Sequence, residues 1–157
     1  NLIGNQVILA DSTFNGAVLN YDQWDGYPVA RARLLQAFDD NDIQNLVVVT
    51  GDIHLAAVAQ LRAGERGTGT PVGVEFVTTS ISSDGLIGDE LTDVLKSFPD
   101  LVDAELAHRG YSLHTVTPQR WTAEYRIVTD VDDVDSDVTS YGTYTVEAGS
   151  NTVAKAP

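Results

Sequence analysis

The chain of 157 residues contains no cysteine, which excludes disulfide bonds, thiolate zinc sites and a cysteine nucleophile. Basic residues are scarce as well, because nine Lys and Arg stand against 23 Asp and Glu and leave a net charge of −14. Phosphate backbones and anionic lipids are bound through clustered Lys and Arg, so we expect neither nucleic acid nor an anionic membrane surface as a partner. The chain also lacks the roughly 18–20 consecutive apolar residues of a spanning helix, and its opening residues do not have the basic and then apolar pattern expected of a signal peptide.

Apolar residues make up 43% of the chain, enough for one compact domain with a hydrophobic core. We expect this domain to cover residues 1–148 and residues 149–157 to form a flexible tail. Of the acidic residues, 17 are Asp. They could form a solvated anionic surface, or some of them could hold hard cations through their oxygens, and composition does not choose between the two.

Hydrophobic patterning predicts a mixed sheet. Apolar runs and alternation predict strands over 6–10, 46–49, 56–62, 72–78 and 142–146, and a hairpin over 111–127 with its turn at 117–119. Helical spacing predicts one helix from Pro28 to about Asp40 and another over 86–98. The order of strand, helix and buried strand, followed by a meander, indicates an α/β (α+β) fold with a mixed sheet.

The strongest candidate site follows the predicted strand 46–49 and reads Thr50-Gly51-Asp52-Ile53-His54. That strand is apolar throughout, so its carboxyl end lies where open α/β sheets place their ligand crevices. Gly51 allows a sharp turn, and the side chains of Asp52 and His54 can then point into one crevice. Carboxylate and imidazole together suit a metal site of mixed hardness, although the pair could instead bond backbone amides and cap the next element.

A second candidate is the segment 22–28, which places Trp24 and Asp25 just before the predicted helix. Asp25 could cap that helix, and both residues could form the wall of a pocket. Arg31 falls on the apolar stripe of the same helix. A guanidinium there should pair with a carboxylate, in a structural ion pair, or with an anionic ligand.

Two other patterns indicate structure rather than function. Residues 130–137 contain Asp133, Asp135 and Asp137 at the spacing of the first ligands of a calcium loop, but the later ligands are missing, so we expect a solvated hairpin loop. The serines that follow strand 72–78 lie in no Gly-x-Ser-x-Gly motif, so a serine hydrolase is not expected.

Five segments taken in order carry a family resemblance. They are DQWDGYP at 22–28, RARLL at 31–35, VVTGDIH at 48–54, VEFVTTSISS at 74–83 and RGY at 109–111. Together they resemble the C-terminal half of PhoD-like alkaline phosphatases, which are phosphomonoesterases and phosphodiesterases of the calcineurin-like metallophosphoesterase superfamily. The resemblance runs from about residue 5 to residue 147, nearly the whole chain.

The resemblance implies half of an αββα sandwich, a mixed sheet with helices on one face. It also implies a secreted or cell-surface enzyme that hydrolyses phosphate monoesters or diesters with two or more divalent or trivalent metals, such as iron and calcium. Asp52 and His54 match the last metal-binding motif of the family. Trp24, Asp25 and Arg31 are the residues expected to line the pocket or to position the ligands.

The motifs that supply the other ligands in this family are absent from the chain. We therefore expect an N-terminal half as its partner, an inactive chain in isolation, and self-association, for example as a homodimer, through the apolar face that the missing half would cover. The alternative function is a non-catalytic acidic calcium-binding or adhesion module, which calcium would stabilise without any need for His54. A third possibility is a salt-adapted soluble domain whose charge lies only on its surface.

Overall fold

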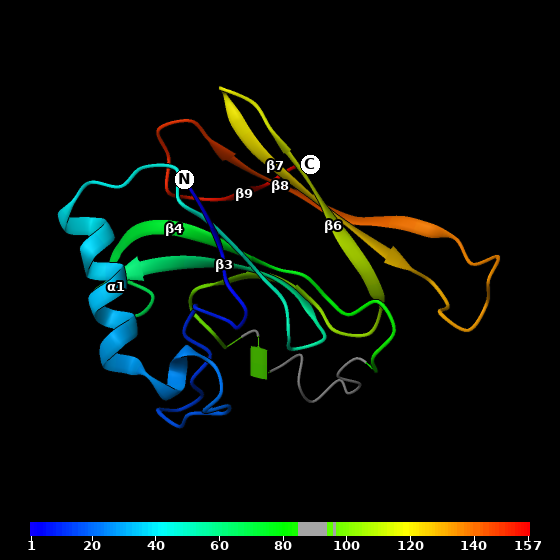
Figure 1. Cartoon of the computed structure of the whole chain (residues 1–157), viewed down its shortest axis with the longest axis horizontal. Coiled ribbons are helices and arrows are strands. Elements are labelled where there is room, and N and C mark those ends of the chain that lie inside the picture. The colour runs from blue at the N-terminus through cyan, green and yellow to red at the C-terminus, as the bar shows by residue number, and fades with distance from the viewer. Residues whose placement is uncertain (85–93, 96) are drawn as a thin grey trace.

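The computed structural model describes residues 1–84, 94–95 and 97–157. Among them, five segments form a first sheet: Leu2–Gly4 (β1), Val47–Thr50 (β2), Ala56–Ala63 (β3), Thr70–Val77 (β4) and Leu101–Glu105 (β5). Four form a second: Arg109–Val116 (β6), Arg120–Val128 (β7), Val138–Glu147 (β8) and Ala154–Lys155 (β9). A 3-10 turn at Trp24–Gly26 (η1) leads into a helix at Pro28–Asp40 (α1). Figure 1 shows the helix beside the first sheet and the second sheet crossing over it.

The first sheet is mixed, as the sequence predicted, with the strand order β1-β2-β4-β3-β5. β1, β2 and β4 run parallel, whereas β3 is antiparallel to both β4 and β5. Because parallel strands end on the same side, the chain leaves β1, β2 and β4 at one edge of the sheet. This edge carries the candidate site described below.

The helix covers one face of the first sheet. Pro28 begins it at a position where the missing N–H costs nothing, and Leu35 is its buried apolar residue. Leu35 and Phe38 pack with Val48 of β2 and Leu61 of β3 in one hydrophobic cluster. Val47 faces the opposite way, as the alternation of side chains along a strand requires.

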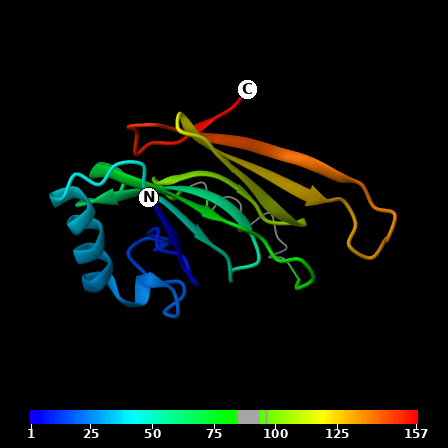
Figure 2. The same cartoon turned by 45° about the horizontal axis from the view of Figure 1, so that its top comes forward.

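The second sheet covers the other face of the first, as Figure 2 shows. Phe76 of β4 and Val58 of β3 pack there against Tyr125 of β7 and Tyr144 of β8, all of them buried. Helix, sheet and sheet thus form three layers of the αββα arrangement. The expectation of self-association assumed that an apolar face of the sheet is exposed. The second sheet of this chain covers that face of the first sheet. The oligomeric state itself stays a prediction.

Most predicted elements are confirmed. The predicted helix at 28–40 is α1, the strands at 46–49, 56–62 and 72–78 are β2, β3 and β4, and the predicted hairpin is formed by β6 and β7. The last predicted strand, at 142–146, lies within the longer β8. The helix predicted over 86–98 lies largely outside the described residues.

The strand predicted at 6–10 is wrong. Within this part of the chain the structure forms β1 at Leu2–Gly4, and residues 6–10 have no strand pairing although Ile8 and Leu9 are buried. The backbone N–H groups of Ile8, Leu9 and Ala10 donate to side-chain oxygens instead of to a neighbouring strand. The apolar run therefore predicted correctly that these residues are buried, but it did not predict which groups accept their backbone hydrogen bonds.

The last nine residues differ from the flexible tail that the sequence predicted. Ala154 and Lys155 form β9 against β8, and the Lys155 Nζ donates to Asp103 Oδ2 at 2.5 Å. The side chain of Asn151 donates to the backbone oxygen of Ile43 at 2.9 Å. Polar side-chain contacts of this kind leave no hydrophobic pattern in the sequence.

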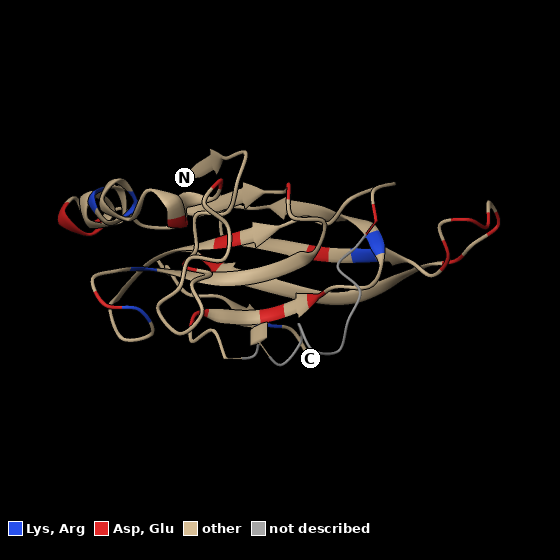
Figure 3. Ribbon diagram, turned by 90° about the horizontal axis from the view of Figure 1, so that it is seen from below, with Lys and Arg blue, Asp and Glu red and all other residues tan. Residues whose placement is uncertain are grey.

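The acidic segment 130–137 forms the solvated loop between β7 and β8 that the sequence predicted. Asp130 and Asp133 accept hydrogen bonds from backbone N–H groups of the loop itself, at 2.9 and 3.0 Å. Figure 3 shows the acidic residues spread over separate segments, this loop and the end of α1 among them. The charge is thus distributed over several parts of the described surface.

Candidate functional site

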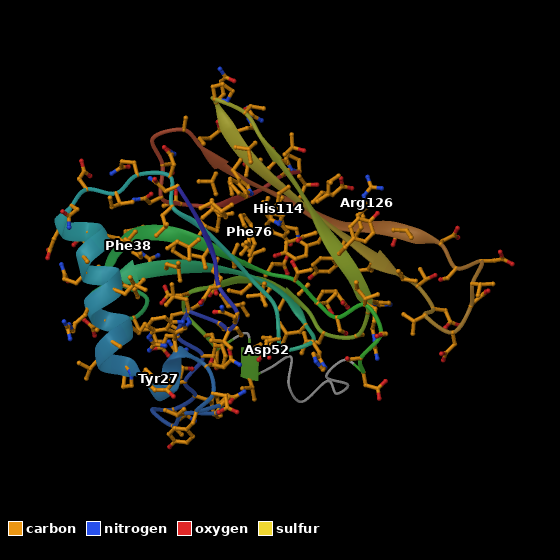
Figure 4. The ribbon with its side chains drawn as sticks, viewed as in Figure 1. Tyr27, Phe38, Asp52, Phe76, His114 and Arg126 are labelled. Atoms are coloured by element: carbon orange, nitrogen blue, oxygen red, sulfur yellow. The ribbon has the colours of Figure 1, made fainter. Side chains whose placement is uncertain are left out.

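The candidate site lies at the edge of the first sheet where β1, β2 and β4 end. Figure 4 shows Asp52 at this edge, whereas Phe76 and His114, whose rings are 5.5 Å apart, lie between the two sheets. Three segments meet near it: the chain after β1, the turn after β2 and the residues of η1. Placement at the carboxyl ends of parallel strands agrees with the prediction and with the usual location of ligand sites in such sheets.

Residues Gly51–His54, here called the Asp52 turn, reverse the chain directly after β2. The Ile53 N–H donates to the Gly51 oxygen at 3.1 Å around Asp52, whose φ is +78°. A γ-turn with a positive central φ is rare, and for a residue with a Cβ such a backbone costs about 1–3 kcal/mol. Strain of this kind persists where the surrounding structure holds it, and it is concentrated at functional sites.

The carboxylate of Asp52 is exposed but held on one side. Its Oδ2 accepts a hydrogen bond from Gln23 Nε2 at 2.8 Å. In the part of the chain that the structure describes, Oδ1 accepts none. One oxygen is thus fixed by the protein and the other is open to a ligand.

His54 also has a left-handed backbone, with φ of +58°. Its Nδ1 lies 3.0 Å from the backbone oxygen of Asp84. A carbonyl oxygen can only accept, so Nδ1 carries a hydrogen, and in the neutral form of the ring the lone pair lies on Nε2. Metal-binding histidines commonly donate their other ring N–H to a carbonyl in this way.

Gln23 was not singled out by the sequence analysis, but it connects the site to the interior. Only 2% of it is exposed. While Nε2 donates to Asp52, its Oε1 accepts from the Ile8 N–H at 2.6 Å. Gln23 therefore holds both the carboxylate and the segment that follows β1.

The buried Asp25 and Arg31 form a cluster with the half-buried Asp11, here called the Arg31 cluster. Arg31 Nη1 donates to Asp25, and Nη2 donates to Asp11 Oδ2 at 2.8 Å. Asp25, 1% exposed, also accepts from the hydroxyl and the backbone N–H of Ser12. The ion pair expected of Arg31 is confirmed. Trp24 is half-buried, packs against the hydrophobic cluster that contains Leu35 and donates its backbone N–H to the Ile8 oxygen.

The charges of the cluster are mutually compensated. Burial alone would raise the pKa of Asp11, but hydrogen bonds from Thr13 and the charges of Arg31 and Arg66 bring that pKa below its usual value. With two carboxylates and a guanidinium bonded to one another and to backbone groups, the cluster is a structural unit. A pocket role for Trp24, Asp25 and Arg31 stays a prediction.

Glu75 is a further buried acid that the sequence analysis did not single out as a site. It is fully buried on β4, where Oε1 accepts from Leu9 N–H at 2.9 Å and Oε2 from Ala10 N–H at 2.7 Å. Burial raises its pKa to about 7, against the opposing effect of these hydrogen bonds. A single acid within an apolar strand was the signal that could have found it.

The donor set of the Asp52 turn fits part of a metal site. An open carboxylate oxygen and an imidazole nitrogen with a fixed tautomer suit a cation that accepts both oxygen and nitrogen ligands. Within the described residues, no group of three or more His, Asp or Glu side chains is arranged to hold a metal ion. The two residues can therefore supply two ligands, and further ligands must come from elsewhere.

Comparison with known proteins identifies the family. The model of the PhoD-like phosphatase family matches residues 1–125. The chain belongs to the PhoD-like phosphatases. It is 34% identical over 135 residues to alkaline phosphatase D of Bacillus subtilis (strain 168), a match that covers 82% of this chain and 23% of that protein.

A solved structure of PhoD agrees with this assignment. It matches all of this chain and 31% of its own, with a TM-score of 0.88 and 28% sequence identity. The fold predicted from the resemblance is thus confirmed. The PhoD-like chain spans less than a third of the length of either relative. None of its described helices is long and apolar enough to cross a membrane.

Proposed function

We propose that this chain is the C-terminal part of a metal-dependent phosphoesterase that hydrolyses phosphate monoesters or diesters. Membership of the PhoD-like family and the likeness to alkaline phosphatase D support a phosphoesterase. The observation that carries the proposal further is the Asp52 turn, where an open carboxylate oxygen and an oriented imidazole follow a central parallel strand.

In this proposal Asp52 binds a metal ion through Oδ1 and His54 binds one through Nε2. Bound metals supply Lewis-acid activation of water and of the phosphoryl oxygens, and iron and calcium are the metals implied by the family resemblance. The chain's own residues hold these donors in place. The Asp84 carbonyl fixes the proton of His54 on Nδ1, and the Gln23 amide keeps Asp52 Oδ2 occupied.

The remaining ligands come, in this proposal, from the part of the enzyme that precedes these residues. Two ligands are too few for a two-metal hydrolytic site, so the isolated chain is expected to be inactive. Secretion or a cell-surface location is part of the proposal and is supported only by the family resemblance.

The test uses Asp52→Asn and His54→Ala in the complete enzyme, with bound metal and kcat/KM for a chromogenic phosphodiester as readouts. We expect both variants to lose metal and to lower kcat/KM at least tenfold, because a ligand is removed. Asp135→Asn, in the loop between β7 and β8, and His114→Ala, between the two sheets, are controls that change the same residue types away from the Asp52 turn. They should keep both values within about twofold.

Wild-type metal content and activity in both variants would refute the assignment of Asp52 and His54. The calcium-binding or adhesion module makes a different prediction. In that case calcium would raise the thermal midpoint equally in the wild type and in His54→Ala, because the histidine would not take part.

A further inference from the structure

We propose that Gln23 is a positioning residue for the metal-binding carboxylate: it holds Asp52 by Oδ2 so that Oδ1 is the oxygen presented to the cation. This inference rests on the proposed function, because it takes Asp52 as a ligand. It assigns a role to a residue that makes no contact with the metal itself.

The contacts of Gln23 support a positioning role. Its Nε2 donates to Asp52 Oδ2 at 2.8 Å, and its Oε1 accepts from the Ile8 N–H at 2.6 Å. The backbone bond fixes which end of the amide faces Asp52, since the backbone N–H can only donate. With 2% of the residue exposed, the amide of Gln23 is itself shielded from water.

The position of Asp52 gives this bond its importance. The residue lies in a strained turn with φ of +78°, and its side chain is exposed. An exposed carboxylate without a neighbour would sample several rotamers, whereas a hydrogen bond from a buried amide selects one. Residues that orient metal ligands in this way typically change metal affinity or activity by about 10–100-fold when removed.

Residues 8–10, which include the donor to Gln23, are themselves held in place by hydrogen bonds. Ile8, which donates to Gln23, is followed by Leu9 and Ala10, whose N–H groups donate to the buried carboxylate of Glu75 on β4. The Trp24 N–H donates back to the Ile8 oxygen at 3.2 Å. The amide that orients Asp52 is therefore anchored to the sheet that carries Asp52.

The test compares Gln23→Met with Gln60→Met in the metal-free complete enzyme. Gln60 is a matched control: it is 7% exposed on β3, and its Nε2 donates to the backbone oxygens of Gly73 and Asn151 at 2.7 Å each. Both variants lose buried hydrogen bonds and should lower the thermal midpoint. We expect only Gln23→Met to weaken Mn²⁺ binding, by about 10–100-fold, with Gln60→Met within about twofold of wild type.

Gln23→Glu separates the two hydrogen bonds of the residue. It keeps an acceptor for the Ile8 N–H but, as a carboxylate, replaces the donor to Asp52 by a like charge. We expect an electron paramagnetic resonance spectrum of bound Mn²⁺ that differs from the wild type, because the repelled Asp52 side chain no longer presents the same oxygen. This variant decides the matter if Gln23→Met does not fold, and a wild-type spectrum would then overturn the proposal.

Asp52→Asn, measured in parallel, distinguishes the two levels of inference. If it weakens Mn²⁺ binding at least tenfold while Gln23→Met binds within twofold of wild type, Gln23 has no positioning role and the proposed function stands. If Asp52→Asn binds Mn²⁺ as the wild type does, Asp52 is no ligand and both proposals fail.

Discussion

The Arg31 cluster and the Asp52 turn are built from similar residues but are held in opposite ways. Asp25 in the cluster is buried and bonded to Arg31 and Ser12, so its charge is compensated. Asp52 is exposed on a strained backbone and bonded on one side only among the described residues. The comparison teaches that a carboxylate already used in an ion pair is structural, whereas one held from one side is available to a ligand.

The largest expected effect would come from breaking the Arg31 cluster. Arg31→Met should lower the free energy of unfolding by about 3–5 kcal/mol, because it leaves the fully buried Asp25 carboxylate without its cation. Urea unfolding of the complete protein measures this. Arg33→Met, which changes an exposed arginine of the same helix, should cost less than about 0.5 kcal/mol. Equal effects of the two substitutions would show that the ion pair carries no special stability.

Glu75 tests a third kind of acid, one that is buried and forms no ion pair among the described residues. Its pKa is about 7 in the folded state against 4.5 as the reference. The folded protein therefore keeps the proton where the unfolded chain releases it. This contribution to stability is full below pH 4.5 and is lost as the pH rises through 7.

The two pKa values of Glu75 differ by an amount that corresponds to about 3 kcal/mol. Between pH 5 and pH 8 the free energy of unfolding of the wild type should fall, relative to Glu75→Gln, by up to about that amount. Urea unfolding of both proteins at the two pH values measures the difference, in which the other titrating groups cancel. Parallel pH dependence of the two proteins would contradict the raised pKa.

The smallest expected effect on stability concerns the left-handed backbone of His54 in the Asp52 turn. His54 has φ of +58°, so His54→Gly should be more stable than His54→Ala by about 1 kcal/mol, because glycine adopts this backbone without a steric penalty. Both variants lose the imidazole, and only the backbone strain differs between them. In α1 the sign should reverse: Ala32→Gly should be less stable than the wild type by about 1 kcal/mol. The same sign at both positions would argue against strain at His54.

The local periodicity of the chain predicted most of its regular elements. β2 and α1 were recognisable because a continuous apolar run and an apolar stripe at helical spacing are properties of neighbouring residues. The motif at 50–54 was placed correctly at the end of β2 for the same reason. Arg31 was expected in an ion pair, since a guanidinium on an apolar stripe needs a counter-charge.

Only the tertiary structure decided which side chains satisfy which backbone groups. Residues 6–10 are apolar enough for a strand, yet Glu75, 65 residues away from Ala10, takes the N–H groups that a strand would use. The partnership of Gln23 with Asp52 spans 29 residues in the same way. Apolar periodicity follows from the local backbone, whereas the pairing of buried polar groups depends on segments that only the completed fold brings together.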